Sequence, residues 1–148
     1  MTFMQVAAFL LHIGAALLMG VAIGMERQFR QHPAGLRTNA LVCVGAALFV
    51  SLSGNVSNDT TATCRMAAYV VSGIGFLGGG VILKMSEQHQ IVGITTAAGI
   101  WLTATIGIAA GTGRLGLAVV GTVLAFVILT FFFRFDHNIP KSGPSDLS

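Results

Sequence analysis

The residues that could do chemistry gather in one short stretch, Gly20–Asn39 (GVAIGMERQFRQHPAGLRTN), which lies between two apolar runs. Its charged residues are Glu26, Arg27, Arg30 and Arg37. A carboxylate at membrane depth is costly unless it is paired, so we expect Glu26 to form a buried or half-buried ion pair with an arginine. The connecting loop is short enough for Glu26 to meet Arg37, and Asn39 at the same level can hydrogen-bond across helices.

An alternative explanation is that these charges only fix the orientation of the chain in a membrane. Basic residues beside membrane spans mark the cytoplasmic side, which accounts for the arginines but not for Glu26, because acidic residues contribute little to orientation. Arg65 can be explained as a side chain that snorkels from the end of a span, and Thr95 as ordinary helix structure. The functional cluster that we predict comprises Glu26, Arg27, Arg37, Asn39, Arg65 and Thr95.

Other kinds of chemistry have little support in the sequence. The four histidines, His12, His32, His89 and His137, do not show metal-ligand spacing. We find no nucleophile with a base and no nucleotide-binding motif, so we expect no catalytic residues, no metal, no cofactor and no enzymatic activity. The net charge of +3 is confined to loops and helix ends, which argues against nucleic acid as a partner.

Composition indicates an integral membrane protein with the lipid bilayer as its surroundings. Only 9% of the 148 residues are charged and the mean hydropathy is +0.82, whereas a soluble domain carries about 25% charged residues. Five apolar runs of spanning length predict an all-α, polytopic fold with about five transmembrane helices. They are Val6–Met25, Leu36–Leu52, Met66–Leu83, Ile94–Ala110 and Leu115–Phe133.

The distribution of basic residues predicts the orientation. One side of the membrane would carry Arg27, Arg30, Arg37, Lys84, Arg134 and Lys141, and the other only Arg65 and Arg114. The first side is therefore expected in the cytoplasm, with the N-terminus outside and the C-terminus inside. We expect a transmembrane domain over residues 1–134 and a polar tail or linker over residues 135–148.

Small residues recur at helical spacing within the spans and predict close helix packing. The expected packing glycines are Gly20 and Gly24 on the first span and Gly73, Gly75, Gly78, Gly79 and Gly80 on the third, and Gly107 and Gly111 continue the pattern on the fourth. Because a protein this small has glycine faces to spare, we also expect a homodimer. An alternative is that residues 73–80 form an unwound, carbonyl-lined segment of the kind that transporters use.

Several motifs resemble the MgtC/SapB family of bacterial membrane proteins. They are GMERQ at residues 24–28, AGLRTNALV at residues 34–42, VSGIGFLGGGVI at residues 71–82 and TTAA at residues 95–98. They occur in order, cover nearly all of residues 14–111, and resemble most the virulence-associated members of the family.

The resemblance implies a multi-pass protein of the bacterial inner membrane. It implies a role in growth at low magnesium and in survival within macrophages, and regulation of ATP synthase rather than magnesium transport. The partners that it implies are ATP synthase subunits or another membrane protein, and a small hydrophobic regulatory peptide. Members commonly continue into a soluble ACT-like domain, which we expect to be absent because the chain stops at Ser148.

Three functional hypotheses remain open at this stage. The first is a regulatory membrane protein that acts by helix–helix contact. The second is a small ion transporter or channel, suggested by residues 73–80 and by the charged cluster. The third is a scaffold in which the charges only fix topology.

Overall fold

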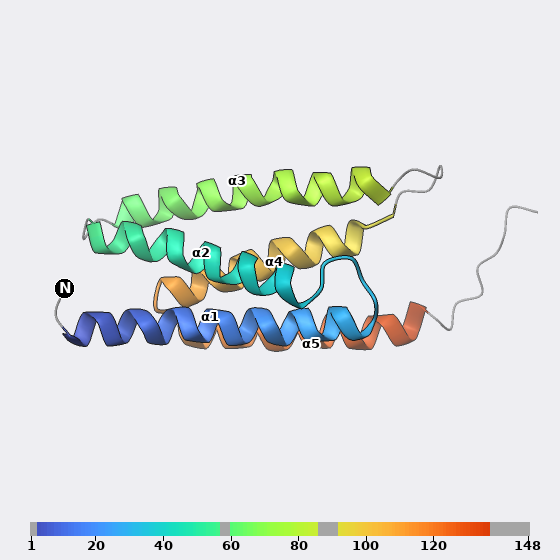
Figure 1. The fold of residues 1–148 in the computed structure, drawn as a ribbon, viewed down its shortest axis with the longest axis horizontal. Coiled ribbons are helices and arrows are strands. Elements are labelled where there is room, and N and C mark those ends of the chain that lie inside the picture. Colours follow the sequence, from blue (N-terminus) through green and yellow to red (C-terminus); the bar gives the residue numbers. More distant parts are fainter. Residues whose placement is uncertain (1–2, 57–59, 86–91, 137–148) are drawn as a thin grey trace, which may run out of the picture.

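A computed structural model describes residues 3–56, 60–85 and 92–136 of the chain, and the described part is helical throughout apart from its connections. The helices are α1 (Phe3–Phe29), α2 (Leu36–Val56), α3 (Thr60–Met85), α4 (Ile94–Gly111) and α5 (Leu115–Asp136) (Figure 1). The all-α prediction is therefore confirmed. From residue 137 onward, the predicted tail lies outside the described residues. His89 and His137 also lie outside them.

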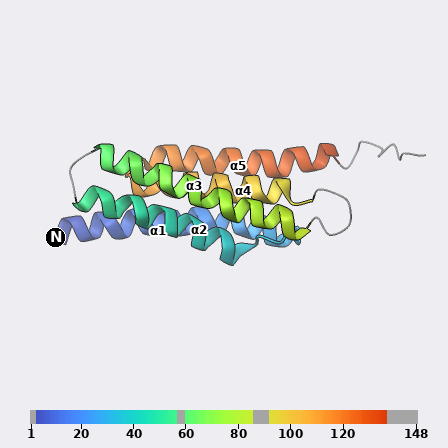
Figure 2. The same cartoon turned by 90° about the horizontal axis from the view of Figure 1, so that it is seen from above.

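The lengths of the helices fit a membrane-spanning bundle. Within the described residues, α1, α2, α3 and α4 are each long and apolar enough to cross a bilayer, and α5 contributes a shorter apolar stretch, Leu115–Phe131. Successive helices run in opposite directions along one common axis (Figures 1 and 2). Main-chain polar groups have no water to bond inside lipid, so a bundle in which each helix satisfies its own backbone is the stable solution.

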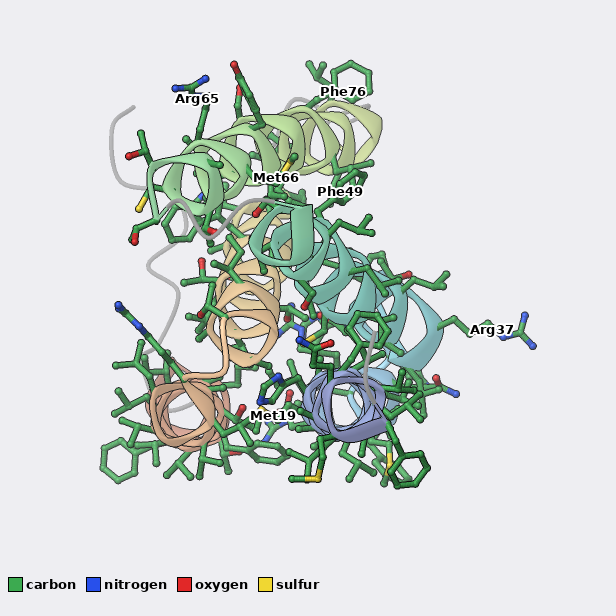
Figure 3. The ribbon with its side chains drawn as sticks, turned by 90° about the vertical axis from the view of Figure 1, so that its left-hand side faces the viewer. Met19, Arg37, Phe49, Arg65, Met66 and Phe76 are labelled. Carbon is green, nitrogen blue, oxygen red and sulfur yellow. The ribbon has the colours of Figure 1, made fainter. Side chains whose placement is uncertain are left out.

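The helix α4 forms the centre of the bundle. It packs against each of the other four helices, whereas α3 packs only against α2 and α4. Seen along the bundle axis, α4 lies between α3 on one side and α5 on the other, with α2 and α1 beside it (Figure 3). Half of the residues in the α4 span are buried inside the bundle, compared with 6% of the residues in the α3 span. Side chains on α4 are therefore the ones best placed to join the elements together.

Glycines on α1 and α4 allow the closest approaches, as predicted. A Cβ atom added to Gly20 would lie 2.8 Å from the Asn39 carbonyl oxygen, and one added to Gly24 would lie 2.6 Å from the Cα atom of Leu36. On α4, a Cβ atom at Gly107 would meet the carbonyl oxygen of Cys43. The three inner helices α1, α2 and α4 thus touch backbone to backbone, as small residues permit in membranes.

The glycines of α3 do not follow this prediction. No atom lies within 4 Å of a Cβ position at Gly73, Gly75, Gly79 or Gly80, and only Gly78 contacts α4, through Ala97. Gly75, Gly79 and Gly80 therefore make no close contact within the described residues, because α3 lies on the outside of the bundle, while Gly73 lines the groove between α2 and α3. The alternative of an unwound segment is also wrong, since α3 is one continuous helix from Thr60 to Met85.

The ends of α1 and α4 are closed by the same backbone motif. After α1, the amide of His32 donates to the Arg27 carbonyl and that of Gln31 to the Gln28 carbonyl. Gln31 adopts φ 56°, the left-handed conformation that this closure requires. After α4, the amides of Arg114 and Gly113 bond in the same way, with Gly113 at φ 77°. The loop after α1 is thereby fixed close to the charged residues.

Candidate functional site

Polar side chains from three helices form a buried network at one end of the bundle. This end, which we call the charged end, is where α1 finishes and α2 and α4 begin (Figure 1). The network comprises Glu26 and Arg27 of α1, Arg30 of the following loop, Asn39 of α2, and Thr96 and Thr103 of α4. Every member either forms an ion pair or bonds to a neighbouring helix, so the network joins α1, α2 and α4.

Arg27 links the first helix to the central one. The residue is 4% exposed, and its Nη2 donates a hydrogen bond to Thr96 Oγ1 at 3.2 Å. The two residues are 69 positions apart, so this contact forms only when the whole bundle is assembled. A buried guanidinium is costly in a membrane protein and marks a working or structural site by default. Gly24, one turn earlier on α1, lets α2 approach closely enough to enclose it.

Glu26 is paired as the sequence suggested, but with a different arginine. Its side chain is 8% exposed and forms an ion pair with Arg30, one helical turn further along. The contact is not an aligned hydrogen bond, because within the described residues neither carboxylate oxygen has a hydrogen-bond donor. Arg37 does not meet Glu26: it is exposed and projects away from the bundle (Figure 3). The predicted pairing with Arg37 is therefore wrong, because the first turn of α2 directs that side chain outward.

Asn39 holds the loop and α4 together. It is 2% exposed, and its Nδ2 donates to the carbonyl oxygens of Ala34 at 2.9 Å and Gly35 at 3.0 Å. Thr103 Oγ1 lies 2.9 Å from Asn39 Oδ1 and 2.9 Å from the Gly99 carbonyl oxygen, so its one proton is shared between these two acceptors. The predicted bond across helices is thus confirmed. Because the amide uses both donors and an acceptor, it fixes the entry of α2 relative to α4.

The pKa of His32 reflects the charges that surround the loop. Burial and the nearby positive charge of Arg27 lower the pKa of His32, and Arg30 lowers it further, while Glu26 acts in the opposite direction. The histidine lies outside the candidate membrane spans. The neutral imidazole is therefore favoured beside a cluster that has more positive than negative charge.

The remaining predicted site residues lie away from this network. Arg65 is exposed at the start of α3, at the opposite end of the bundle, and points outward (Figure 3). Thr95 is exposed, so the structure gives it no place in the network. Among residues 3–56, 60–85 and 92–136, we find no three His, Cys, Asp or Glu side chains grouped as metal ligands.

Sequence reasoning missed Arg30, Thr96 and Thr103 as network members. Their spacing did carry a signal: Thr96 and Thr103 are seven residues apart, two helical turns, and so face the same way from α4. The sequence did not show which of two adjacent threonines faces inward, because both open the span. One residue of helix rotation, about 100°, separates the buried Thr96 from the exposed Thr95.

Valine substitutions at these two positions should separate their roles. Thr96→Val keeps the shape of the side chain but removes the acceptor for Arg27, so we expect it to lower the free energy of unfolding by about 1–2 kcal/mol. Thr95→Val is the matched control and should change it by less than about 0.5 kcal/mol. Unfolding by SDS titration in detergent micelles measures both. Equal losses in the two variants would contradict the assignment of Thr96 to the network.

An apolar bundle with a charged network buried at one end is the architecture of a multi-pass membrane protein. The MgtC family matches residues 13–138, which is most of the chain, and the chain belongs to that family. Protein MgtC of Brucella abortus (strain 2308) is 49% identical over 116 residues, covering 78% of this chain and 48% of the relative. Protein MgtC of Salmonella typhi is 46% identical over 141 residues, covering 93% and 59%.

The similarity also extends beyond proteins that carry this name. An uncharacterized protein of Synechocystis sp. is 48% identical over 118 residues, covering 80% of this chain and 49% of that protein. The chain spans about half the length of the curated relatives that it matches. No solved structure matches it.

Proposed function

We propose that this chain is a non-enzymatic regulatory protein of the bacterial inner membrane, which acts by helix–helix contact with another membrane complex. The observation that carries the proposal is the outward face of α3. Gly73, Gly75 and Gly79 lie on that helix with nothing within 4 Å of their Cβ positions. Helices in lipid associate through small residues that let backbones approach, and these glycines are unused within the chain.

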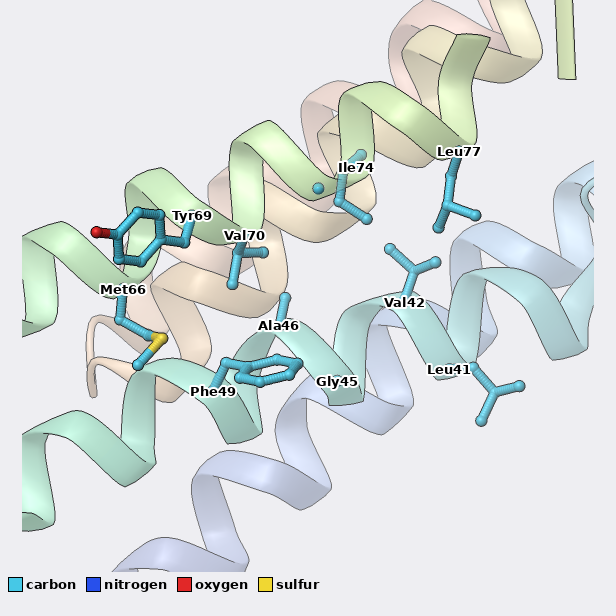
Figure 4. A pocket seen from close by; sticks show the side chains of 11 residues that line it. Leu41, Val42, Gly45, Ala46, Phe49, Met66, Tyr69, Val70, Ile74 and Leu77 are labelled. Carbon is cyan, nitrogen blue, oxygen red and sulfur yellow. The ribbon is translucent and has the colours of Figure 1, made fainter. Parts of the chain in front are cut away.

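Large apolar side chains border these glycines. Phe76 is 84% exposed and Tyr69 is 65% exposed, on a helix of which very little is buried. Between α2 and α3 runs an apolar groove of about 530 Å³, lined by residues that include Phe49 of α2 and Met66 and Ile74 of α3 (Figure 4). A helix from another protein would find both a close backbone approach and ridges to pack against.

The identity of the partner rests on the family. MgtC-family membership supports an association with virulence, and we propose growth at low magnesium and survival in macrophages as the setting. The partner that we propose is the membrane-embedded part of ATP synthase, restrained through contact with α3. The continuous α3 helix removes one of the two features that suggested an ion transporter or channel, the unwound segment over residues 73–80.

A leucine on the open face of α3 tests the proposal. Gly75→Leu should abolish co-purification with ATP synthase subunits from cells grown in low magnesium, because the added side chain blocks close approach at a position where a Cβ atom would have nothing within 4 Å. Gly116→Leu is the matched control: Gly116 of α5 is also exposed with nothing within 4 Å, and its variant should retain the subunits.

Two results would contradict the proposal. One is unchanged co-purification of Gly75→Leu. The other is a normal cytoplasmic ATP level in a deletion strain under magnesium limitation. Capture of a second copy of this chain in place of ATP synthase would identify α3 as a homodimer interface instead.

A further inference from the structure

A second cleft, of about 320 Å³, lies at the end of the bundle opposite the charged network. Four segments meet there: the first turns of α1, the last turns of α2, the start of α3 and the turn between α4 and α5 (Figure 1). Its lining includes Phe9, His12, Val50, Ser51, Thr63 and Thr112. None of this belongs to the charged end, and the inference does not depend on the function proposed for α3.

Among the residues that the structure describes, the lining contains no Asp, Glu, Lys or Arg residue. A charged ligand would find no counter-ion among these residues, and its desolvation would not be compensated. Phe9 and Val50 supply an apolar wall, and the hydroxyl groups, the imidazole and the Gln5 amide supply polar atoms. The chemistry therefore fits a neutral molecule that has both a flat apolar part and polar atoms, in a cleft of the size that small ligands use.

Two of the three hydroxyl groups in the lining, those of Ser51 and Thr112, already donate their protons to carbonyl oxygens of the chain. Thr112 Oγ1 donates to the Ala109 carbonyl oxygen at 3.0 Å, and Ser51 Oγ donates to the Gly111 carbonyl oxygen at 2.9 Å. A hydroxyl has one proton and two lone pairs, so Thr112 can offer a ligand only an acceptor. A ligand that donates hydrogen bonds is thus favoured over one that only accepts them.

His12 supplies the other polar group. The structure shows no hydrogen bond from its imidazole to any part of the chain that it describes. Its Cε1 and Nε2 atoms lie 3.4 and 3.6 Å from where a Cβ atom of Gly113 would be, so the ring edge packs along the turn next to Thr112. A neutral imidazole has one donor nitrogen and one acceptor nitrogen, so His12 can accept a hydrogen bond from a ligand or donate one to it.

Part of the cleft lies within the candidate membrane spans. His12 is nine residues into α1, about 14 Å along the helix axis, and within a span that is apolar enough to cross a bilayer. A neutral ligand can therefore reach the cleft from the lipid phase. These features together favour a lipid-soluble molecule over one dissolved in water.

We propose that this cleft binds a neutral, membrane-soluble molecule with a hydroxylated ring, of the quinol type. Its O–H groups donate to the acceptor nitrogen of His12 and to Thr112 Oγ1, and its ring lies against Phe9 and Val50. The oxidised quinone carries only acceptors. No proton is then available for a hydrogen bond between the quinone and Thr112 Oγ1. The contact with Thr112 therefore favours the reduced form.

Binding of a short-chain probe to the protein in nanodiscs tests this. A decyl-substituted benzoquinol, kept anaerobic, should bind saturably by isothermal titration calorimetry. The corresponding quinone and the dimethyl ether of the quinol should bind at least about tenfold more weakly, the loss expected when one hydrogen bond is missing and an acceptor is left unpaired.

Two α1 variants complete the test. His12→Phe keeps a ring in the cleft but removes both nitrogens, and it should weaken quinol binding about tenfold. Leu18→Phe places the same side chain on an exposed position of α1 and should leave binding unchanged. Thermal unfolding of each variant confirms that it is folded. The proposal is overturned if no saturable binding occurs, if quinone and quinol bind equally, or if His12→Phe binds as well as the unchanged protein.

Discussion

Replacement of Gly107 by alanine is expected to lower the free energy of unfolding by about 3 kcal/mol, the upper part of the range for overpacking a core. The added methyl group would meet the Cys43 carbonyl oxygen and would lie 3.0 Å from the Cβ atom of Ala46. Backbone atoms cannot rotate out of the way as a flexible side chain can. The variant must therefore push α4 and α2 apart, at the centre of the bundle.

The matched control is Gly99→Ala on the same helix. No atom lies within 4 Å of a Cβ position there, so the substitution should be neutral or should stabilise the protein by up to about 1 kcal/mol, through helix propensity alone. Unfolding by SDS titration, with circular dichroism as the readout, measures both variants. If Gly107→Ala were as stable as Gly99→Ala, the close crossing of α2 and α4 would be wrong.

Substitution of Arg27 by methionine is expected to cost about 3 kcal/mol, the low end of the range for removing one partner from a buried charged group. It deletes the link to Thr96 and leaves the buried carboxylate of Glu26 with only Arg30 as a compensating charge. We expect the low end of this range because Arg30 still forms its ion pair with Glu26. Under the function proposed above, the variant should also fail to support growth at low magnesium, because the bundle that presents α3 is loosened.

Arg37→Met provides the comparison. Arg37 has the same charge and lies at the same end of the bundle, but it is exposed, so its loss should change stability by less than about 0.5 kcal/mol. Thermal unfolding in detergent and growth in magnesium-limited medium give the two readouts. Equal effects of the two substitutions would mean that charge near the membrane surface, and not the buried network, is what matters.

Most of the fold could be predicted from the sequence because its cause is local. Each apolar run is long enough to span lipid, and the polar segments between the runs place the turns. The starts of α2, α4 and α5 coincide with the predicted starts of their spans. The packing of Gly20 and Gly24 was also predictable, because the requirement for small residues at a close crossing is local to the helix.

The partners of the charged residues were harder to predict because they depend on helix rotation and on long-range packing. The short loop after the first span suggested that Glu26 meets Arg37, yet the ion pair forms with Arg30, one helical turn away. Thr95 and Thr96 are the same residue type, so the sequence does not distinguish them. The packing of α4 decides which of them faces Arg27. The glycines of α3 fit the same spacing rule as those of α1, but spacing does not show whether the neighbouring helix belongs to the same chain.

The central place of α4 has a consequence for the order in which the protein is made. Ribosomes deliver α1, α2 and α3 before α4, so the early intermediate has Arg27 without Thr96 and the Asn39 side-chain oxygen without Thr103. Unsatisfied polar side chains are costly in lipid, and the contacts of Arg27 and Asn39 with α4 can form only once the fourth helix is inserted. Because α1 and α2 pack closely on each other without α4, we expect this pair to form early and the insertion of α4 to complete the polar contacts.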